Sequence, residues 1–128
     1  MKNQNNKEER DKWKKEFSVR LITFSVQALH FADELRKNRV LWPVADQLVR
    51  SATSVGANVT EAQGSASKKD FANFFHIALK SAKETQYWLL VIAHYEKRQS
   101  PKANELLEEI KEISRVLTSS LLTMKGQK

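Results

Sequence analysis

The chain has 128 residues, of which 41% are hydrophobic and none is cysteine. This length suits one domain with its own core, and the lack of cysteine excludes disulfides, cysteine-ligated metals and thiol nucleophiles. The polar run at residues 1–7 lacks the apolar core of a signal peptide, and no apolar run approaches the roughly 18 residues of a membrane span. We therefore expect a cytoplasmic protein with no membrane partner.

The charge balance is basic and unevenly distributed. Lysine and arginine number 22 against 15 aspartate and glutamate residues, which gives a formal charge of +7. Residues 36–83 carry eight basic and three acidic side chains, so most of the excess lies in the middle of the chain. Such a field attracts polyanions through phosphate contacts, and the same charge also promotes solubility. Both interpretations stay open at this point.

The first predicted element is a long helix over about residues 9–37, preceded by a flexible polar tail at 1–8. Apolar residues at steps of three and four form one stripe along it. The members of this stripe are Trp13, Phe17, Leu21, Phe24, Ala28, Phe31 and Leu35. Ile22, Val26 and Leu29 form a second stripe about 100° round the helix. A helix of an isolated bundle needs one stripe, so the second predicts another contact surface.

A second helix is predicted over 43–63, with Pro43 at its first position, where a missing N–H does no harm. Gly56 in the middle of this helix costs about 1 kcal/mol relative to alanine. We expect a neighbouring backbone to approach closely at this position. The apolar seam of the helix consists of Val44, Leu48, Val55, Val59 and Ala62.

The third and fourth helices are predicted over 68–97 and 101–124, followed by a tail at 125–128. Ser67 and Asp70 resemble a capping box, and Ser100-Pro101 resembles an N-cap followed by a first helical residue. The third helix has a second apolar face, formed by Ile77, Trp88, Val91 and Tyr95. Short connections between four helices predict an all-α, antiparallel up-down-up-down four-helix bundle.

The sequence offers little for catalysis. Di-metal bundles need inward Glu-x-x-His pairs, and no glutamate here has a histidine three residues later. His30, His76 and His94 occur singly and are interpreted as surface or boundary residues. No nucleophile elbow and no glycine-rich phosphate loop is present. We therefore predict a protein that is not an enzyme and has neither a metal nor another cofactor.

A polar stripe follows the apolar seam of the second helix. Arg50, Ser54, Asn58 and Glu61 follow one another at steps of four, four and three. Arg50 and Glu61 are separated by roughly 16 Å along the helix and cannot pair with each other. Each needs a partner from the third helix, where Lys80, Lys83 and Glu84 are candidates, or from a neighbouring subunit. We favour a structural polar network of Arg50, Ser54, Asn58, Glu61 and Glu84 over a binding groove.

Basic residues gather near the third helix. Lys68, Lys69, Lys80 and Lys83 lie at its start and along its first half, and Arg50 precedes them on the second helix. In a monomer such residues usually form a solvated face. In a ring of identical subunits the patch repeats and its field adds.

Three runs resemble the four-helix-bundle family of the 23S rRNA intervening sequence. They are ADQLVRSATSVGANVTEA at 45–62, SKKDF at 67–71 and IALKSAKETQYW at 77–88. The most specific part is the pattern Arg-Ser-x-x-Ser-Val-x-x-Asn-Val-x-Glu at 50–61. Ala52 stands where many relatives have glycine. The likeness covers about residues 15–95, and the fourth helix fits in length and pattern.

The resemblance implies an up-down bundle that assembles into a closed homo-oligomeric ring, commonly a pentamer. It also implies a relation to the accessory variability determinant of diversity-generating retroelements, a basic pentamer that binds nucleic acid and a reverse transcriptase. We therefore predict a non-catalytic homo-oligomer that binds RNA or DNA through phosphate contacts of Arg50, Lys68, Lys69, Lys80 and Lys83. An adaptor for a reverse transcriptase, or an assembly with no nucleic-acid role, is the alternative.

Overall fold

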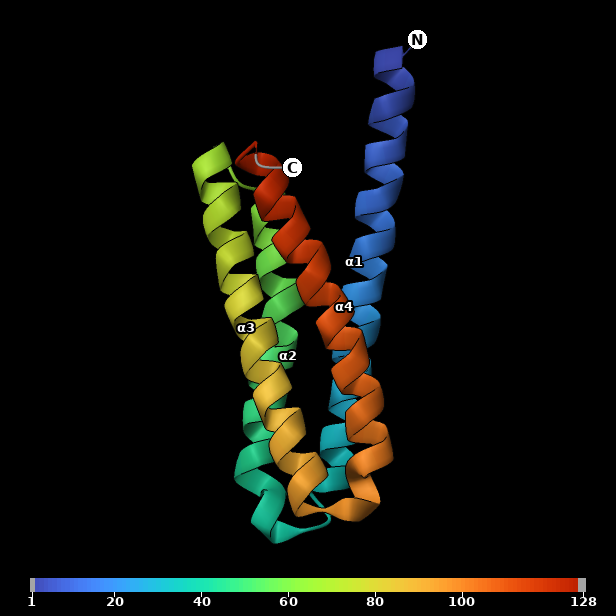
Figure 1. The fold of residues 1–128 in the computed structure, drawn as a ribbon, viewed down its shortest axis with the longest axis vertical. Coiled ribbons are helices and arrows are strands. Elements are labelled where there is room, and N and C mark those ends of the chain that lie inside the picture. Colours follow the sequence, from blue (N-terminus) through green and yellow to red (C-terminus); the bar gives the residue numbers. More distant parts are fainter. Residues whose placement is uncertain (1, 127–128) are drawn as a thin grey trace.

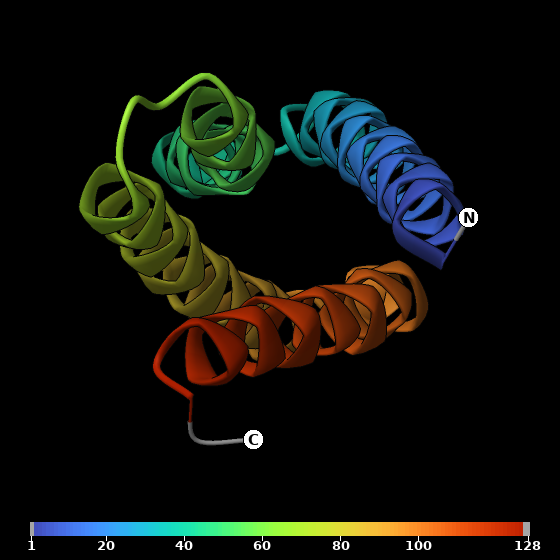
Figure 2. The ribbon, with the colours of Figure 1, turned by 90° about the horizontal axis from the view of Figure 1, so that it is seen from above.

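The computed structural model describes residues 2–126 and contains four α-helices and no strand within that range. They are α1 (Lys2–Leu35), α2 (Trp42–Gln63), α3 (Lys68–Tyr95) and α4 (Ser100–Met124), with 3-10 turns at Arg39–Leu41 and Lys97–Gln99. Consecutive helices run in opposite directions and surround a common interior (Figures 1 and 2). The predicted all-α, up-down-up-down fold is thus confirmed.

The helix ends follow the local sequence signals. Ser67 is the N-cap of α3, and its hydroxyl accepts a hydrogen bond from the Asp70 backbone N–H at 3.1 Å, as predicted. Pro43 and Pro101 lie in the first turns of α2 and α4. The predicted N-cap role of Ser100 is wrong, because Gln99 is the N-cap of α4 and the Ser100 hydroxyl donates to the Ala93 carbonyl at 2.7 Å. The first and third helices end two residues earlier than expected, because 3-10 turns complete the two short connections.

The first helix begins at Lys2, and not near residue 9. The predicted flexible tail at 1–8 is therefore wrong for residues 2–8, while Met1 lies outside the described residues. Residues 2–16 contain neither glycine nor proline and are rich in Lys, Glu, Gln and Arg, which are good helix formers. Pairs at i,i+4 such as Lys12–Glu16 add support. As a result, α1 projects beyond the other helices at its N-terminal end (Figure 1).

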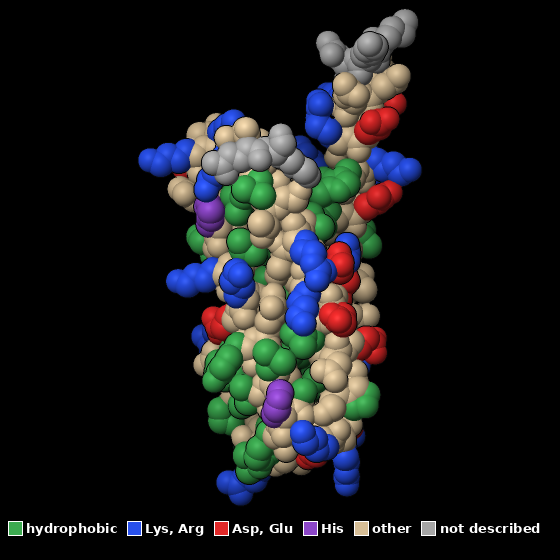
Figure 3. All heavy atoms as spheres, viewed as in Figure 1, with side chains coloured by type: hydrophobic (Ala, Val, Ile, Leu, Met, Phe, Trp, Pro, Cys, Tyr) green, Lys and Arg blue, Asp and Glu red, His purple; other side chains and the backbone are tan. Residues whose placement is uncertain are grey.

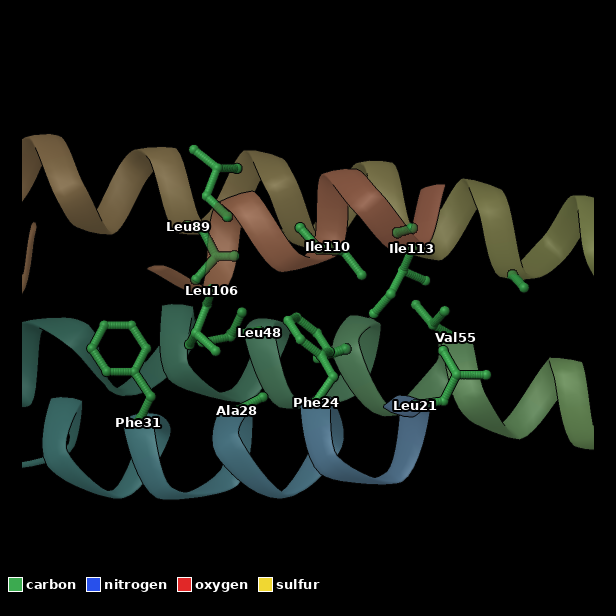
Figure 4. Close-up of a cluster of buried hydrophobic side chains, with 14 of the residues drawn as sticks. Leu21, Phe24, Ala28, Phe31, Leu48, Val55, Leu89, Leu106, Ile110 and Ile113 are labelled. Atoms are coloured by element: carbon green, nitrogen blue, oxygen red, sulfur yellow. The ribbon is translucent and has the colours of Figure 1, made fainter. Parts of the chain in front are cut away.

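The core is formed by one apolar stripe from each helix. Phe24 of α1, Leu48 of α2, Leu89 of α3 and Ile110 of α4 are almost fully buried and point into the interior (Figure 4). The predicted first stripe of α1 is buried from Phe17 to Leu35. Trp13 is the exception, with 46% of its surface exposed. The periodicity of the sequence therefore predicts the core facing of each helix but not where the bundle ends.

Gly56 lies where α2 passes close to α1. A Cβ added there would meet the Leu21 Cβ at 3.4 Å, which is ordinary van der Waals contact. The predicted close approach is present, yet it leaves room for a methyl group.

We therefore expect Gly56→Ala to raise the free energy of unfolding. Alanine restricts the unfolded chain and favours the helix, so the gain should be about 0.5–1 kcal/mol. Urea denaturation followed by circular dichroism measures it. A loss of stability would mean that α1 and α2 pack more tightly at this position than the structure shows.

An ion pair joins α1 to α4 where the two helices meet. The Arg20 guanidinium donates from Nε and one Nη to the two carboxylate oxygens of Glu109, at 2.7 and 2.8 Å. This hydrogen bonding raises the pKa of Arg20; burial lowers it, and the charges of Glu109 and Glu112 raise it further. The first helix makes far fewer contacts with α4 than with α2. The Arg20–Glu109 pair is therefore an important contact between α1 and α4.

Removing one partner of the Arg20–Glu109 pair should lower the free energy of unfolding. The pair is bidentate and half-buried, so Arg20→Gln should cost about 1–2 kcal/mol. A double-mutant cycle with Glu109→Gln, measured by urea denaturation, isolates the coupling of the two side chains. Purely additive effects would show that the pair does not fasten α1 to α4.

Candidate nucleic-acid interface

The basic face of α3 consists of Lys68, Lys69, Lys80 and Lys83, all of which are exposed. Lys80 and Lys83 lie about three and four helical turns after Lys69, so these three lysines share the outer side of the helix. Lys68 lies at the edge of this outer side. Within residues 2–126 none of the four forms an ion pair. Basic side chains, which on α3 are all lysine, project from the upper part of this helix in Figure 3.

The basic face has the length of a short nucleic-acid contact. Lys69 and Lys83 are fourteen residues apart, or about 21 Å along the helix, which matches the rise of about six base pairs. The exposed His76 lies on the same outer line, and two exposed carboxylates, Asp70 and Glu84, directly follow Lys69 and Lys83 in the sequence. The N-terminus of α3 adds positive potential beside Lys68 and Lys69.

Polar side chains join α2 to α3 in a seam that is buried at Ser51 and Thr85 and partly buried elsewhere. The Thr85 hydroxyl donates to the Ser51 hydroxyl at 2.9 Å, and the Ser54 and Ser81 hydroxyls lie 2.9 Å apart. Asn58 donates to the Ser54 hydroxyl at 3.0 Å and to the Ser54 carbonyl at 2.8 Å. We call these five residues the polar seam. Within the described chain no buried side-chain polar atom lacks a hydrogen-bond partner, so the seam is satisfied.

The structure brings together two members of the predicted polar network. Ser54 and Asn58 belong to the polar seam. Arg50 and Glu61 are exposed, and Glu84 accepts a hydrogen bond from the Trp88 indole N–H at 3.1 Å. Register across the seam places Arg50 at the height of Thr85 and Gln86, and among residues 2–126 no ion pair involves Arg50. Arg50 is therefore an exposed cation next to the basic face.

The sequence analysis did not predict three residues of the polar seam or the Arg20–Glu109 ion pair between α1 and α4. Ser51, Ser81 and Thr85 lie outside the predicted polar network. Hydroxyl residues at steps of three and four in both the second and third predicted helices are the signal that predicts a polar seam. No such local signal exists for Arg20 and Glu109, which are 89 residues apart in the sequence.

The predicted second stripe of α1 lies on the surface, whereas that of α3 does so only at Ile77 and Tyr95, because Trp88 and Val91 are partly buried. Ile22, Val26 and Leu29 of α1 are exposed beside a groove between α1 and α2, whose other wall includes Gly56 and Ala57. We call this the α1–α2 groove. On α3 the exposed apolar residues are Ile77, Tyr87, Leu90 and Tyr95. Hydrophobic side chains gather over the lower part of α3 in Figure 3.

The described part of the chain, residues 2–126, has neither a cluster of metal-ligating side chains nor a membrane-spanning helix. No three His, Asp or Glu side chains of this part of the chain gather in a way that could hold a metal ion. The His94 ring contacts the Leu90 carbonyl through Nδ1 at 2.8 Å. None of the described helices is both long enough and apolar enough to span a bilayer.

The fold and this surface define a class of small, basic, all-α proteins: a four-helix bundle with a hydroxyl seam and a lysine-rich outer face. The model of the 23S rRNA-intervening sequence protein family matches residues 13–119. The chain belongs to this family, as its sequence runs predicted.

A solved structure agrees with this assignment. It is the crystal structure of a protein of unknown function from the S23 ribosomal protein family of Bacteroides thetaiotaomicron. The two chains share 30% identity with a TM-score of 0.77, over 82% of this chain and 97% of that chain. No curated protein matches the chain.

Proposed function

We propose that this protein is a non-catalytic homo-oligomer that binds RNA or DNA through phosphate contacts. The observation that carries this proposal is the basic face of α3, on which Lys68, Lys69, Lys80 and Lys83 are exposed without ion pairs in the described chain. Unpaired surface lysines release counterions from a phosphate backbone when they bind it. Arg50 extends the same field onto α2.

The exposed apolar surfaces support self-association. Exposed apolar residues such as Ile22 and Val26 on α1, and Tyr87 and Leu90 on α3, form two different patches on one subunit. Two different patches that fit each other make a head-to-tail contact, which closes into a ring when the rotation allows it. A ring of five subunits would carry five times +7, or +35. Such a charge favours bound polyanion.

Sequence preference should be weak. Lysine offers a point charge without the planar fork that reads a base edge, and phosphate contacts carry no sequence information. We therefore expect several sequences of equal length and strandedness to bind alike.

Salt-dependent binding tests the proposal. Fluorescence anisotropy with labelled single-stranded RNA, single-stranded DNA and duplex DNA at several KCl concentrations gives the affinity and its salt slope. We expect log K to fall linearly with log[salt], with a slope of about −0.9 for each phosphate contact on duplex DNA. No binding at low salt would contradict the proposal and would favour a protein-binding adaptor role.

A further inference from the structure

A second groove opens between α1 and α4, at the end of the bundle where α1 projects. Beyond the Arg20–Glu109 pair the two helices diverge, as both ribbon views show (Figures 1 and 2). The space between them has a volume of about 660 Å³ and is lined by α1, the start of α3 and the last turns of α4. We call it the α1–α4 groove.

The floor of the α1–α4 groove is apolar. Trp13 of α1, Phe71 of α3 and Val116 of α4 line it. Trp13 continues the core stripe of α1 one turn beyond Phe17, on which its ring stacks at 5.3 Å. Yet 46% of Trp13 is exposed, because α4 has already turned away. The groove floor is therefore a continuation of the core that this chain does not cover.

The rim of the α1–α4 groove is cationic on both sides. Arg10 and Lys14 lie on the α1 wall and Arg115 on the α4 wall, and the lining includes no aspartate or glutamate. Arg115 pairs with Glu112 of its own helix at 2.6 Å. Arg10 and Lys14 have no ion-pair partner among residues 2–126. The groove thus combines an apolar floor with two unpaired cations on the α1 edge and a cation paired with Glu112 on the α4 edge.

We propose that the α1–α4 groove binds an amphipathic helix of a different protein, with acidic residues on both sides of its apolar stripe. Such a helix would lay its apolar stripe on Trp13, Phe71 and Val116, as in other helix-in-groove complexes. Its carboxylates would reach Arg10 and Lys14 on one side and Arg115 on the other.

Charge and geometry select this occupant. The projecting residues 2–9 of a second copy carry two basic and two acidic side chains and no apolar one, so they offer neither an apolar stripe for the floor nor net negative charge for the rim. A nucleic-acid strand in a cationic groove stacks its bases on free aromatic faces, and here Phe71 already stacks on Phe75 at 4.6 Å. One ring face of Trp13 is already covered by Phe17.

Part of the groove lies outside the region that the family model matches. The family model matches residues 13–119, so Arg10 of the α1 wall and Ser120 and Thr123 of the α4 wall lie outside the matched region. The docking site does not depend on the proposed nucleic-acid binding, because it uses different residues.

A designed peptide tests this inference. The probe is a labelled, acetylated peptide of about 16 residues, or four turns, with leucine on one face and glutamate on both flanks. A scrambled peptide of the same composition and a peptide with lysine in place of glutamate are the controls. Trp42→Phe/Trp88→Phe makes Trp13 the reporter of occupancy. We expect the amphipathic acidic peptide to bind and to change Trp13 emission, and the two control peptides to bind at least about tenfold more weakly.

Variants locate the binding. Arg10→Glu/Lys14→Glu should lower the affinity for the peptide by about tenfold or more. The control Lys97→Glu/Arg98→Glu has the same change of charge and should alter this affinity less than about twofold. Both pairs are exposed, so folding is preserved, and circular dichroism checks it. Trp13→Ala should weaken the peptide by a similar factor.

Three results would overturn the inference. They are equal binding of the scrambled peptide, an Arg10/Lys14 effect no larger than that of Lys97/Arg98, and an oligonucleotide that changes Trp13 emission when the peptide does not. Lys80→Glu/Lys83→Glu separates the two proposals. This variant should lower the affinity for nucleic acid and leave the affinity for the peptide within about twofold of the unchanged protein.

Discussion

Reversing the four lysines of the basic face is expected to abolish nucleic-acid binding at moderate salt. At 0.1 M salt each phosphate contact adds about 0.9 log units to the binding constant for duplex DNA, so four lost contacts amount to about a thousandfold or more. The variant carries Lys68→Glu, Lys69→Glu, Lys80→Glu and Lys83→Glu. Anisotropy titrations should also show a salt slope smaller by about 3.6.

A charge-matched variant separates the face from the overall charge. Lys7→Glu, Lys15→Glu, Lys97→Glu and Arg98→Glu reverse four exposed cations that lie off the basic face of α3. Each reversal removes two units, so both variants change the subunit from +7 to −1. We expect the matched variant to lose far less affinity, because long-range attraction is screened within about 10 Å at this salt. Equal losses would assign the binding to net charge alone.

Placing carboxylates on the exposed stripe of α1 is expected to dissociate the assembly into 14.8 kDa monomers. Ile22→Glu/Val26→Glu would bury charge without a partner in the proposed subunit contact, at a cost of several kcal/mol. Ile22 and Val26 are exposed in the isolated subunit, at 63% and 43%, so the bundle itself should stay folded. Light scattering measures the mass, and circular dichroism measures the helix content.

The control for this variant is Val40→Glu. Val40 is an apolar residue with 61% exposure, but it belongs to the turn Arg39–Leu41 and lies outside both apolar stripes. Its substitution should leave the mass unchanged. If Ile22→Glu/Val26→Glu also leaves the mass unchanged, the subunit contact does not use the α1–α2 groove.

The helices and their core facing could be predicted because they follow from local periodicity. Leu48, Val55 and Val59 recur at helical spacing, and all three are buried as that spacing requires. The start of α1 could not be read in the same way. Its first turns have no apolar pattern, and their helical state rests on the propensities of Lys, Glu, Gln and Arg.

Long-range contacts explain what else the sequence analysis missed. Trp13 lies at a core position of its helix, but its exposure depends on where α4 turns away from α1. Arg50 and Glu61 are the two charged residues of the predicted polar stripe. The buried contact between α2 and α3 is nevertheless formed by a pair of hydroxyls, Ser51 and Thr85. Small hydroxyls fit a close helix contact at less desolvation cost than ions. The exposure of the basic face was predictable, because lysine is rarely buried.

Size-exclusion chromatography with light scattering and absorbance at two wavelengths tests the proposed function most directly. The protein is purified without nuclease at moderate salt, so that bound nucleic acid is retained. We predict a particle of several subunits, near five, with excess absorbance at 260 nm that high salt removes. A monomer free of nucleic acid would contradict both the assembly and the binding, whereas a nucleic-acid-free oligomer would contradict the binding alone.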